Sequence, residues 1–208
     1  MLDDLLLLII SSPSGAGKTT LTRDLLAYFS DLTFSVSHTT RRPRPSEQND
    51  RDYHFVSRDE FDALVQQQAF VEWAEVHNNF YGTSIAEIER ARRESRRGIV
   101  FDVDYQGARQ IRAVRSDAIS VFVLPPSMEE LKRRLRARAS DDDSAIERRY
   151  RNARAEIEHY GLFDYVLVND DLEQTKLRLR SIVQAERSRR ARMAPLAEKL
   201  LRESRSQH

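Results

Sequence analysis

Four short apolar runs recur along the chain, and each is separated from the next by a stretch with helical periodicity. The runs are LLLLII at 5–10, IVFDVD at 99–104, ISVFVL at 119–124 and YVLVN at 165–169. Continuous apolar runs of this length, bounded by turn residues, are typical of strands buried on both faces of a sheet. Strands of this kind alternating with helices predict an α/β fold with a central parallel sheet.

The segment directly after the first run, SSPSGAGKTT, is nearly a phosphate-binding loop (P-loop). The pattern G-x-x-x-x-G-K-[ST] is satisfied at Gly17, Lys18 and Thr19, but Ser12 stands where the first glycine is usual. Pro13 favours an extended backbone at Ser12, so we expect the serine to be tolerated. A helix is expected to begin at Gly17, because leucines recur at helical spacing after it. Its first-turn N–H groups, the lysine charge and the threonine hydroxyl are suited to a polyphosphate and Mg²⁺.

The starts of four further helices are predicted by the Ser-x-x-Glu pattern of a capping box. In this motif each of the two side chains satisfies a backbone N–H that the helix leaves unpaired. The four pairs are Ser57 with Glu60, Ser84 with Glu87, Ser127 with Glu130, and Ser144 with Glu147.

A second anion pocket is indicated by the block SVSHTTRRPRPSEQNDRDYHF and by FVEWAEVHNNFYGTS, which follows it. Arg41 and Arg44 flank a proline that stiffens the loop, and Tyr53 and Tyr81 offer hydroxyl groups. Guanidinium groups bind a phosphate dianion in bidentate fashion. The acceptor of a transferred phosphoryl group is therefore expected to be anionic itself.

Glu72 lies in an alternating strand pattern at a position expected to be partly buried. A carboxylate there matches the adjacent N–H and amino donors of guanine, a pair that adenine does not supply. Ser37 and Thr83 are candidates for hydrogen bonds to the acceptor edge of the base.

Two carboxylates, Asp102 and Asp104, end the strand predicted at 99–104, where open α/β sheets bind their ligands. We expect Asp102 in the Mg²⁺ water shell or beside the acceptor phosphate, and Asp104 on the guanine side. Asn169 ends the last apolar run, where it either contacts the adenine side or caps the next helix.

Arginines are concentrated in LKRRLRARASDDDSAIERRYRNARAE. Arg134 and Arg138 are four residues apart on one helical face, and Arg149 lies near the start of the next helix. These three are candidates for ATP phosphate contacts, and the other arginines of the segment are expected to be solvated.

The motifs taken together resemble the guanylate kinase family over roughly residues 5–184. They are SSPSGAGKTT, SVSHTTRRPR, DYHFVS, FVEWAEV, NFYGTS, DVDYQG, LPPS and VNDD, in that order. The resemblance implies a P-loop three-layer α/β fold with a central parallel sheet, a GMP-binding insertion with a small mixed sheet, and a helical lid. The implied boundaries are core 5–35, 91–126 and 156–184, insertion 36–90, lid 127–155, and a basic C-terminal helical extension or tail at 185–208.

The resemblance also implies ATP-dependent phosphorylation of GMP or dGMP with Mg²⁺, and it assigns roles to matching positions. The ATP-binding set is Ser12, Pro13, Ser14, Gly15, Ala16, Gly17, Lys18, Thr19, Thr20, Arg134 and Asn169. The GMP-binding set is Ser37, Arg41, Arg44, Tyr53, Glu72, Tyr81, Thr83, Asp102 and Asp104. The catalytic set is Lys18, Arg41, Arg134, Arg138, Arg149 and Asp102, with Thr19, and Asp102 through water, as the Mg²⁺ contacts.

The sequence departs from the family pattern at several positions. Besides Ser12, His38 replaces a small hydroxyl residue, Thr83 stands where serine is common, and Asp50 occupies a site that is often glycine. None of these changes removes a proposed contact, and we expect His38 to be a packed strand residue.

Composition limits the alternatives. The 208 residues carry a formal net charge of +1 and no cysteine, so nucleic acid is not an expected partner and disulfides are excluded. No segment reads as a membrane span or a secretion signal, so we expect a cytoplasmic protein. A homo-oligomer is left open.

Three other functions remain to be weighed. They are a non-catalytic guanylate-kinase-like interaction module, a related small-molecule phosphate kinase, and nucleic-acid binding through the Arg-rich end. Intact Lys18 and Thr19 argue against the first, and Glu72 with Tyr81 and Thr83 against the second. The seven basic residues after position 186 are interleaved with acids, which argues against the third.

Overall fold

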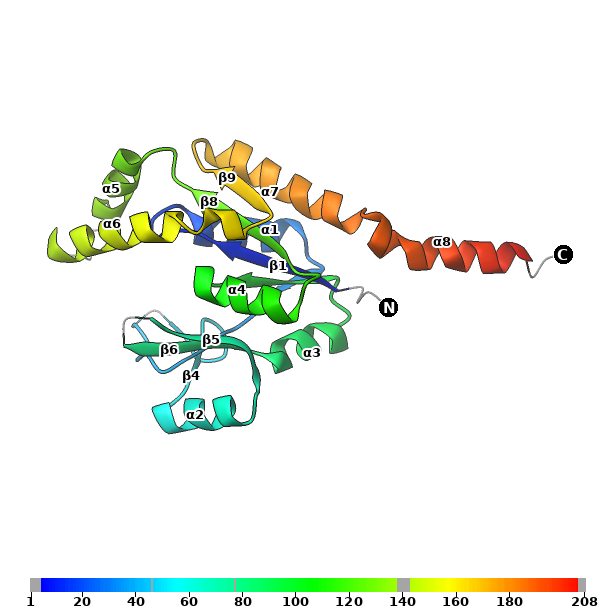
Figure 1. The fold of residues 1–208 in the computed structure, drawn as a ribbon, viewed down its shortest axis with the longest axis horizontal. Helices are drawn as coiled ribbons and strands as arrows, with labels where there is room; N and C mark the ends of the chain where they lie inside the picture. The colour runs from blue at the N-terminus through cyan, green and yellow to red at the C-terminus, as the bar shows by residue number, and fades with distance from the viewer. Residues whose placement is uncertain (1–4, 46, 77, 138–142, 206–208) are drawn as a thin grey trace.

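The computed structural model describes residues 5–45, 47–76, 78–137 and 143–205. Its centre is a five-stranded sheet in the order β2-β7-β1-β8-β9, in which every pairing is parallel (Figure 1). The strands are β1 (Leu6–Ser11), β2 (Leu32–Phe34), β7 (Gly98–Asp102), β8 (Ile119–Leu124) and β9 (Tyr165–Val168). The predicted central parallel sheet is confirmed.

Helices cover both faces of this sheet, which makes three layers (Figure 1). On one face lie α1 (Lys18–Tyr28) and α7 (Leu172–Arg187), and on the other α3 (Ile85–Arg93) and α4 (Tyr105–Val114).

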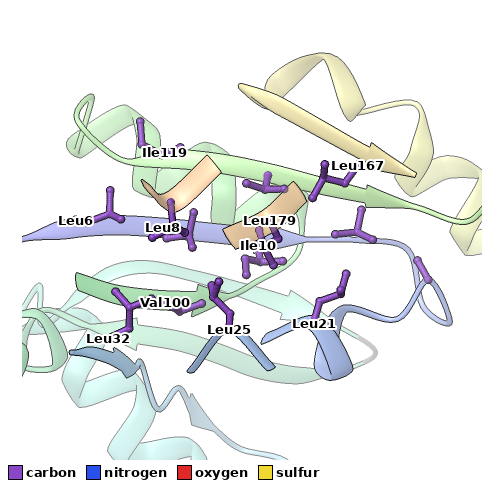
Figure 2. Close-up of a cluster of buried hydrophobic side chains, with 14 residues drawn as sticks. Leu6, Leu8, Ile10, Leu21, Leu25, Leu32, Val100, Ile119, Leu167 and Leu179 are labelled. Atoms are coloured by element: carbon purple, nitrogen blue, oxygen red, sulfur yellow. The ribbon is translucent and has the colours of Figure 1, made fainter. Parts of the chain in front are cut away.

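All six residues of β1 are buried, which explains why this strand reads as an unbroken apolar run. Leu6, Leu8 and Ile10 point to the α1 and α7 side, where Leu25 and Leu179 meet them (Figure 2). The alternate residues of β1 pack on the α3 and α4 side. A fully buried leucine contributes about 2 kcal/mol, so this strand anchors the loop that follows it.

A second, mixed sheet in the order β4-β3-β6-β5 is built on the segment between β2 and α3. Its strands are β3 (His38–Thr39), β4 (His54–Phe55), β5 (Phe70–Val76) and β6 (Asn79–Ser84), and α2 (Arg58–Gln66) covers one face. Phe61 of α2 is fully buried there against Phe70 and Phe80.

Two side chains tie the small sheet to the core. Gln110 of α4 pairs with the main chain of Trp73 on the edge strand β5, accepting from its N–H at 3.1 Å and donating to its carbonyl at 2.8 Å. Glu87 of α3 accepts from the Val36 N–H at 2.8 Å, where the chain passes from core to small sheet. These contacts fix the angle at which the small sheet faces the P-loop.

The remaining helices are α5 (Met128–Arg136), α6 (Asp143–Ile157), the short 3₁₀ helix η1 (Tyr160–Leu162), and α8 (Arg190–Arg205), which extends away from the body (Figure 1). None of the helices within the described ranges has both the length and the apolar character needed to cross a bilayer.

The predicted capping boxes are realised unequally. Ser57 and Glu60 form a complete box, and Ser127 caps α5 by accepting from the Glu130 N–H. Ser84 occupies the N-cap of α3, but within the described residues its side chain makes no capping bond, and the Glu87 carboxylate pairs with Val36 and Arg90 instead. The fourth prediction is wrong: α6 begins at Asp143, so Ser144 lies inside the helix.

Candidate active site

The loop after β1 has the backbone that a P-loop requires. Gly15 and Gly17 have φ of 95° and 102°, a left-handed region that side chains disfavour. A Cβ on Gly17 would also come within 2.3 Å of the Asn169 side-chain nitrogen. Ser12 is not among the described residues with positive φ, so serine is tolerated there as expected. The loop leads directly into α1, whose first-turn N–H groups are unpaired within the helix.

Asn169 supports this loop from the end of β9. Its buried side-chain amide donates to the Ala16 carbonyl at 2.8 Å. The alternative that Asn169 caps the following helix is wrong, because the N-cap of α7 is Asp171, which accepts from the Gln174 N–H. The side chain of Asn169 therefore supports the P-loop by binding the main chain of that loop.

Lys18 bridges the P-loop and the neighbouring strand. Its ammonium forms an ion pair with Asp102 at the end of β7 and lies 3.4 Å from the Val103 carbonyl oxygen. Thr19 and Thr20 are exposed in the first turn of α1. The cation and the carboxylate thus meet at the carboxyl edge of the sheet, as expected from their positions after the first strand and at the end of the strand at 99–104.

A cavity of about 200 Å³ opens between this edge and the small sheet, and we name it the β5–β6 cavity. Its lining comprises Lys18, Ser37, Tyr53, Glu72, Ala74, Val76, Tyr81, Asp102, Val103, Asp104 and Glu156. Alternate residues of β5 face it, because side chains of a strand point to opposite sides in turn. A register shift between Phe70 and Glu72 sets which residues these are.

Glu72 is the most buried acid of this cavity, with 5% of its surface exposed. Burial raises the pKa of its carboxyl to about 7. Hydrogen bonds from Thr83, its partner across the strands, lower the pKa and so oppose part of this rise. The Ser37 hydroxyl lies 3.4 Å from that of Thr83. Gly107 leaves room for the Glu72 carboxylate, since a Cβ there would approach it to 2.8 Å and displace the side chain. The three predicted base contacts thus form one cluster.

Asp104 has a second, structural task. It is the N-cap of α4, and its carboxylate accepts from the Gly107 N–H at 2.9 Å while lining the β5–β6 cavity. One carboxylate oxygen is therefore committed to the helix.

The predicted phosphate arginines behave differently from each other. Arg41 pairs with Glu47 at 2.9 Å and lies 5.4 Å from the Tyr53 ring centre, and the hydrogen bond that it donates to Glu47 raises the pKa of its guanidinium. Arg44 is exposed, and its backbone N–H donates to Glu47 at 2.8 Å. The Tyr53 and Tyr81 rings meet edge to face, 6.1 Å apart. Glu47 thus orders the loop that carries both arginines.

A larger cavity of about 550 Å³, which we name the α6 cavity, lies between the P-loop and α6. It is lined by Ser14, Asn78, Arg148, Arg149, Asn152 and Glu156. Arg149 thus lines the same cavity as Ser14 of the P-loop, and Arg148, expected to be solvated, lines it as well.

Glu156 belongs to both cavities. It accepts from the Ser14 N–H at 3.3 Å, and burial raises the pKa of its carboxyl. A carboxylate thus lies against a P-loop amide at the boundary between the two spaces.

Arg134 reaches the same region from α5. Its guanidinium donates to Glu130 at 2.7 Å and to the Asn169 carbonyl at 3.0 Å. Arg138 falls outside the described residues. His38 is packed between His54 and Phe70, with ring centres 4.6 Å and 5.5 Å away, which agrees with the packed role expected for it.

Sequence reasoning missed three residues of this region: Glu47, Gly107 and Glu156. A signal existed for the last, because Asn152 and Glu156 follow Arg149 at three and seven residues and so share its helix face. Gly107 could not be found in this way, because its contact is with Glu72 on a distant strand. Glu47 contacts Arg41 and Arg44 of its own loop, but no motif distinguished it from the other acids there.

A main-chain phosphate loop whose lysine lines a cavity together with a buried carboxylate and two phenols defines a class of protein: P-loop kinases of small phosphorylated substrates. Comparisons with known proteins make the class specific.

The sequence model described as guanylate kinase matches residues 5–186. The chain is 50% identical to a guanylate kinase of Dechloromonas aromatica over 202 residues, covering 94% of this chain and 98% of that protein. It is also 50% identical to one of Rhizobium meliloti, covering 93% and 88%. A crystal structure of guanylate kinase from Anaplasma phagocytophilum matches with a TM-score of 0.74 and 36% identity, covering 90% of this chain and 89% of that one. The chain belongs to the guanylate kinase family.

Proposed function

We propose that this protein transfers the γ-phosphoryl group of ATP to GMP or dGMP, giving ADP and the corresponding diphosphate. One observation supports the proposal: the β5–β6 cavity is lined both by the buried Glu72, whose partner across the strands is Thr83, and by the P-loop Lys18. A candidate base-recognition group and a candidate phosphate-binding group thus line the same cavity.

The site residues divide between the two substrates. The loop Ser12–Thr20 with Arg134 takes the ATP phosphates, and Asn169 supports that loop from behind. Glu72, Thr83 and Ser37 take the base of the acceptor. Arg41, Arg44, Tyr53 and Tyr81 take its phosphate.

Mg²⁺ fits the donor set. The Thr19 hydroxyl is exposed at the start of α1, and the Asp102 carboxylate faces Lys18. Within the described residues no group of three or more His, Asp or Glu side chains suited to a metal ion occurs, so substrate phosphates and water would complete the shell. When bound, the ion supplies positive charge to the ATP phosphates.

The chain's own groups neutralise and align two polyanions. Lys18 brings its charge to the point where the P-loop and β7 meet, and Arg134 and Arg149 add theirs from α5 and α6. The acceptor phosphate oxygen is already ionised at neutral pH, so no side-chain nucleophile or general base is needed. Arginines in this role contribute about 10³- to 10⁵-fold in rate.

We further propose that segment 36–90 acts as the acceptor-binding unit and 127–155 as a lid, which together exclude water when both substrates are bound. The proposed partners are therefore small nucleotides. A chain without cysteine also suits the reducing cytoplasm, where we expect it to act.

A coupled assay for ADP release tests the proposal, with Mg-ATP as donor and GMP, dGMP, AMP and a sugar phosphate as acceptors. We expect turnover with GMP or dGMP only. Preferred use of a sugar phosphate or AMP would refute guanine recognition. Absence of turnover with every acceptor, in protein that binds GMP, would favour a non-catalytic interaction module.

A further inference from the structure

A small cavity lined by three arginines lies at the end of the sheet opposite the P-loop. Its lining is Leu6, Arg97, Arg187, Arg192 and Met193, and its volume is about 20 Å³. Leu6 begins β1 and Arg97 directly precedes β7, whereas the P-loop follows the other end of β1. The cavity also marks the junction of α7 and α8, beyond which α8 leaves the body (Figure 1).

Two of these arginines bury hydrogen-bond donors that have no acceptor among the described residues. Arg187 pairs with Asp31 at 2.8 Å and lies 4.7 Å from the Phe29 ring centre, yet its Nε is buried without a partner in the described part of the chain. The same holds for Nη1 of Arg192, whose Nη2 lies 3.4 Å from the Asp117 carbonyl. Folded proteins satisfy nearly all such groups, so an acceptor belongs in this cavity.

Charge favours an anion over water as that acceptor. Of the nearby carboxylates, Asp31 pairs with Arg187. Asp117 forms its ion pair with Arg115, and the charge of Arg192 acts on it as well. Arg97 adds a further positive charge at the exposed mouth. A cavity of this size holds one oxygen atom and leaves the rest of an oxyanion at the mouth. A water molecule would fill the space and leave the excess charge uncompensated.

We propose that the cavity of Arg97, Arg187 and Arg192 binds a phosphate group, at a site separate from the nucleotide site. The three residues come from the core, from the last residue of α7 and from the first turn of α8. A phosphate held by all three fixes the start of α8 against the sheet, because guanidinium groups bind phosphate by paired hydrogen bonds.

Hydrogen exchange of the α8 amides tests the proposal on the full chain. The nucleotide site is first saturated with GMP and a non-hydrolysable ATP analogue, so that the P-loop takes no further anion. Inorganic phosphate is then compared with potassium chloride at equal ionic strength. At a phosphate concentration about ten times Kd, linkage slows exchange through local opening by about tenfold. A second arm replaces inorganic phosphate by ADP. If ADP slows exchange of the α8 amides and inorganic phosphate does not, the bound phosphate group belongs to a nucleotide.

Variants locate the effect. Arg192→Gln and Arg97→Gln should each abolish the slowing, and Arg187→Gln is a third variant that also loses the Asp31 pair. Arg190→Gln, exposed on the same helix, is the matched control and should keep it. Unchanged exchange in the wild type, or an equal loss in Arg190→Gln, would overturn the proposal.

The acidic residues Asp3 and Asp4 precede Leu6 in the sequence and supply one further comparison. If phosphate slows exchange only in the Asp3→Asn/Asp4→Asn variant, the acceptors come from the chain itself and the proposal fails. Equal slowing in this variant and the wild type supports a site for an external phosphate.

Discussion

The two proposed anion pockets are built from different chemical groups. The P-loop uses main-chain amides fixed by two left-handed glycines and by the Asn169 amide, on a strand buried throughout. The acceptor side uses side chains that depend on neighbours, as Arg41 depends on Glu47. A main-chain pocket is sensitive to added volume, whereas a side-chain pocket is sensitive to a change of charge or of a single atom.

Glu72→Gln should have the largest effect on catalysis, and this effect should be confined to the acceptor substrate. An amide nitrogen would face the guanine donors, and discrimination built on such buried pairs reaches about 10⁴-fold. We expect kcat/KM for GMP to fall by about 10³- to 10⁴-fold, with KM for ATP nearly unchanged. Glu75→Gln, exposed on the same strand, is the control. Equal losses for both substrates would refute the assignment.

Gly17→Ala breaks the other pocket by volume. The new Cβ would collide with Asn169 and force a left-handed alanine, together about 3 kcal/mol, or about 10²-fold in kcat/KM for ATP. Steady-state kinetics with each substrate varied in turn should show GMP affinity retained. Gly161→Ala, with nothing within 4 Å of the added carbon and no positive φ, controls for loss of glycine itself.

The pH dependence of GMP use should reveal the buried acid. Because the pKa of Glu72 is raised to about 7, its carboxyl group is protonated below that pH. The guanine donors, in contrast, require the ionised carboxylate. We therefore expect the ionisation of Glu72 to raise kcat/KM for GMP about fivefold between pH 6 and 7, with a plateau above pH 8. The phosphate of GMP titrates near pH 6, so Glu72→Gln should retain only that lower step. A wild-type profile identical to that of the variant would exclude Glu72 as the titrating group.

Glu156→Gln should produce the smallest change, and in the opposite direction. The carboxylate competes with an ATP phosphate for the Ser14 N–H, and removing its charge relieves about 1 kcal/mol of repulsion. Calorimetry should show ATP binding about fivefold more tightly. Glu158→Gln, exposed just beyond α6, removes the same charge without the contact. Weaker ATP binding in Glu156→Gln would show that the carboxylate assists the nucleotide.

Sequence alone predicted most of the core, because buried parallel strands and the P-loop are encoded locally. Each of these features could be predicted from a pattern only a few residues long. They are the apolar run of β1, the glycines after it and the carboxylates at the end of β7. The three-residue strand β2 carries no comparable run and was not anticipated.

What the sequence did not predict depends on which of several partners a side chain selects. Glu87 matched the capping pattern but contacts Val36, and Asn169 matched a cap but holds Ala16. Asp50, which replaces a frequent glycine, has φ of 63°, so the backbone reason for glycine became visible only with the fold. Such choices are set by tertiary neighbours that no short motif contains.

The pairing of Gln110 with the main chain of Trp73 has a consequence for behaviour at high concentration. An unprotected outer strand is a template on which another polypeptide can extend the sheet, a common route to aggregation. The glutamine amide occupies one donor and one acceptor of that template, as a single residue of an added strand would. We therefore expect colloidal solubility and the placement of the small sheet to depend on the same side chain.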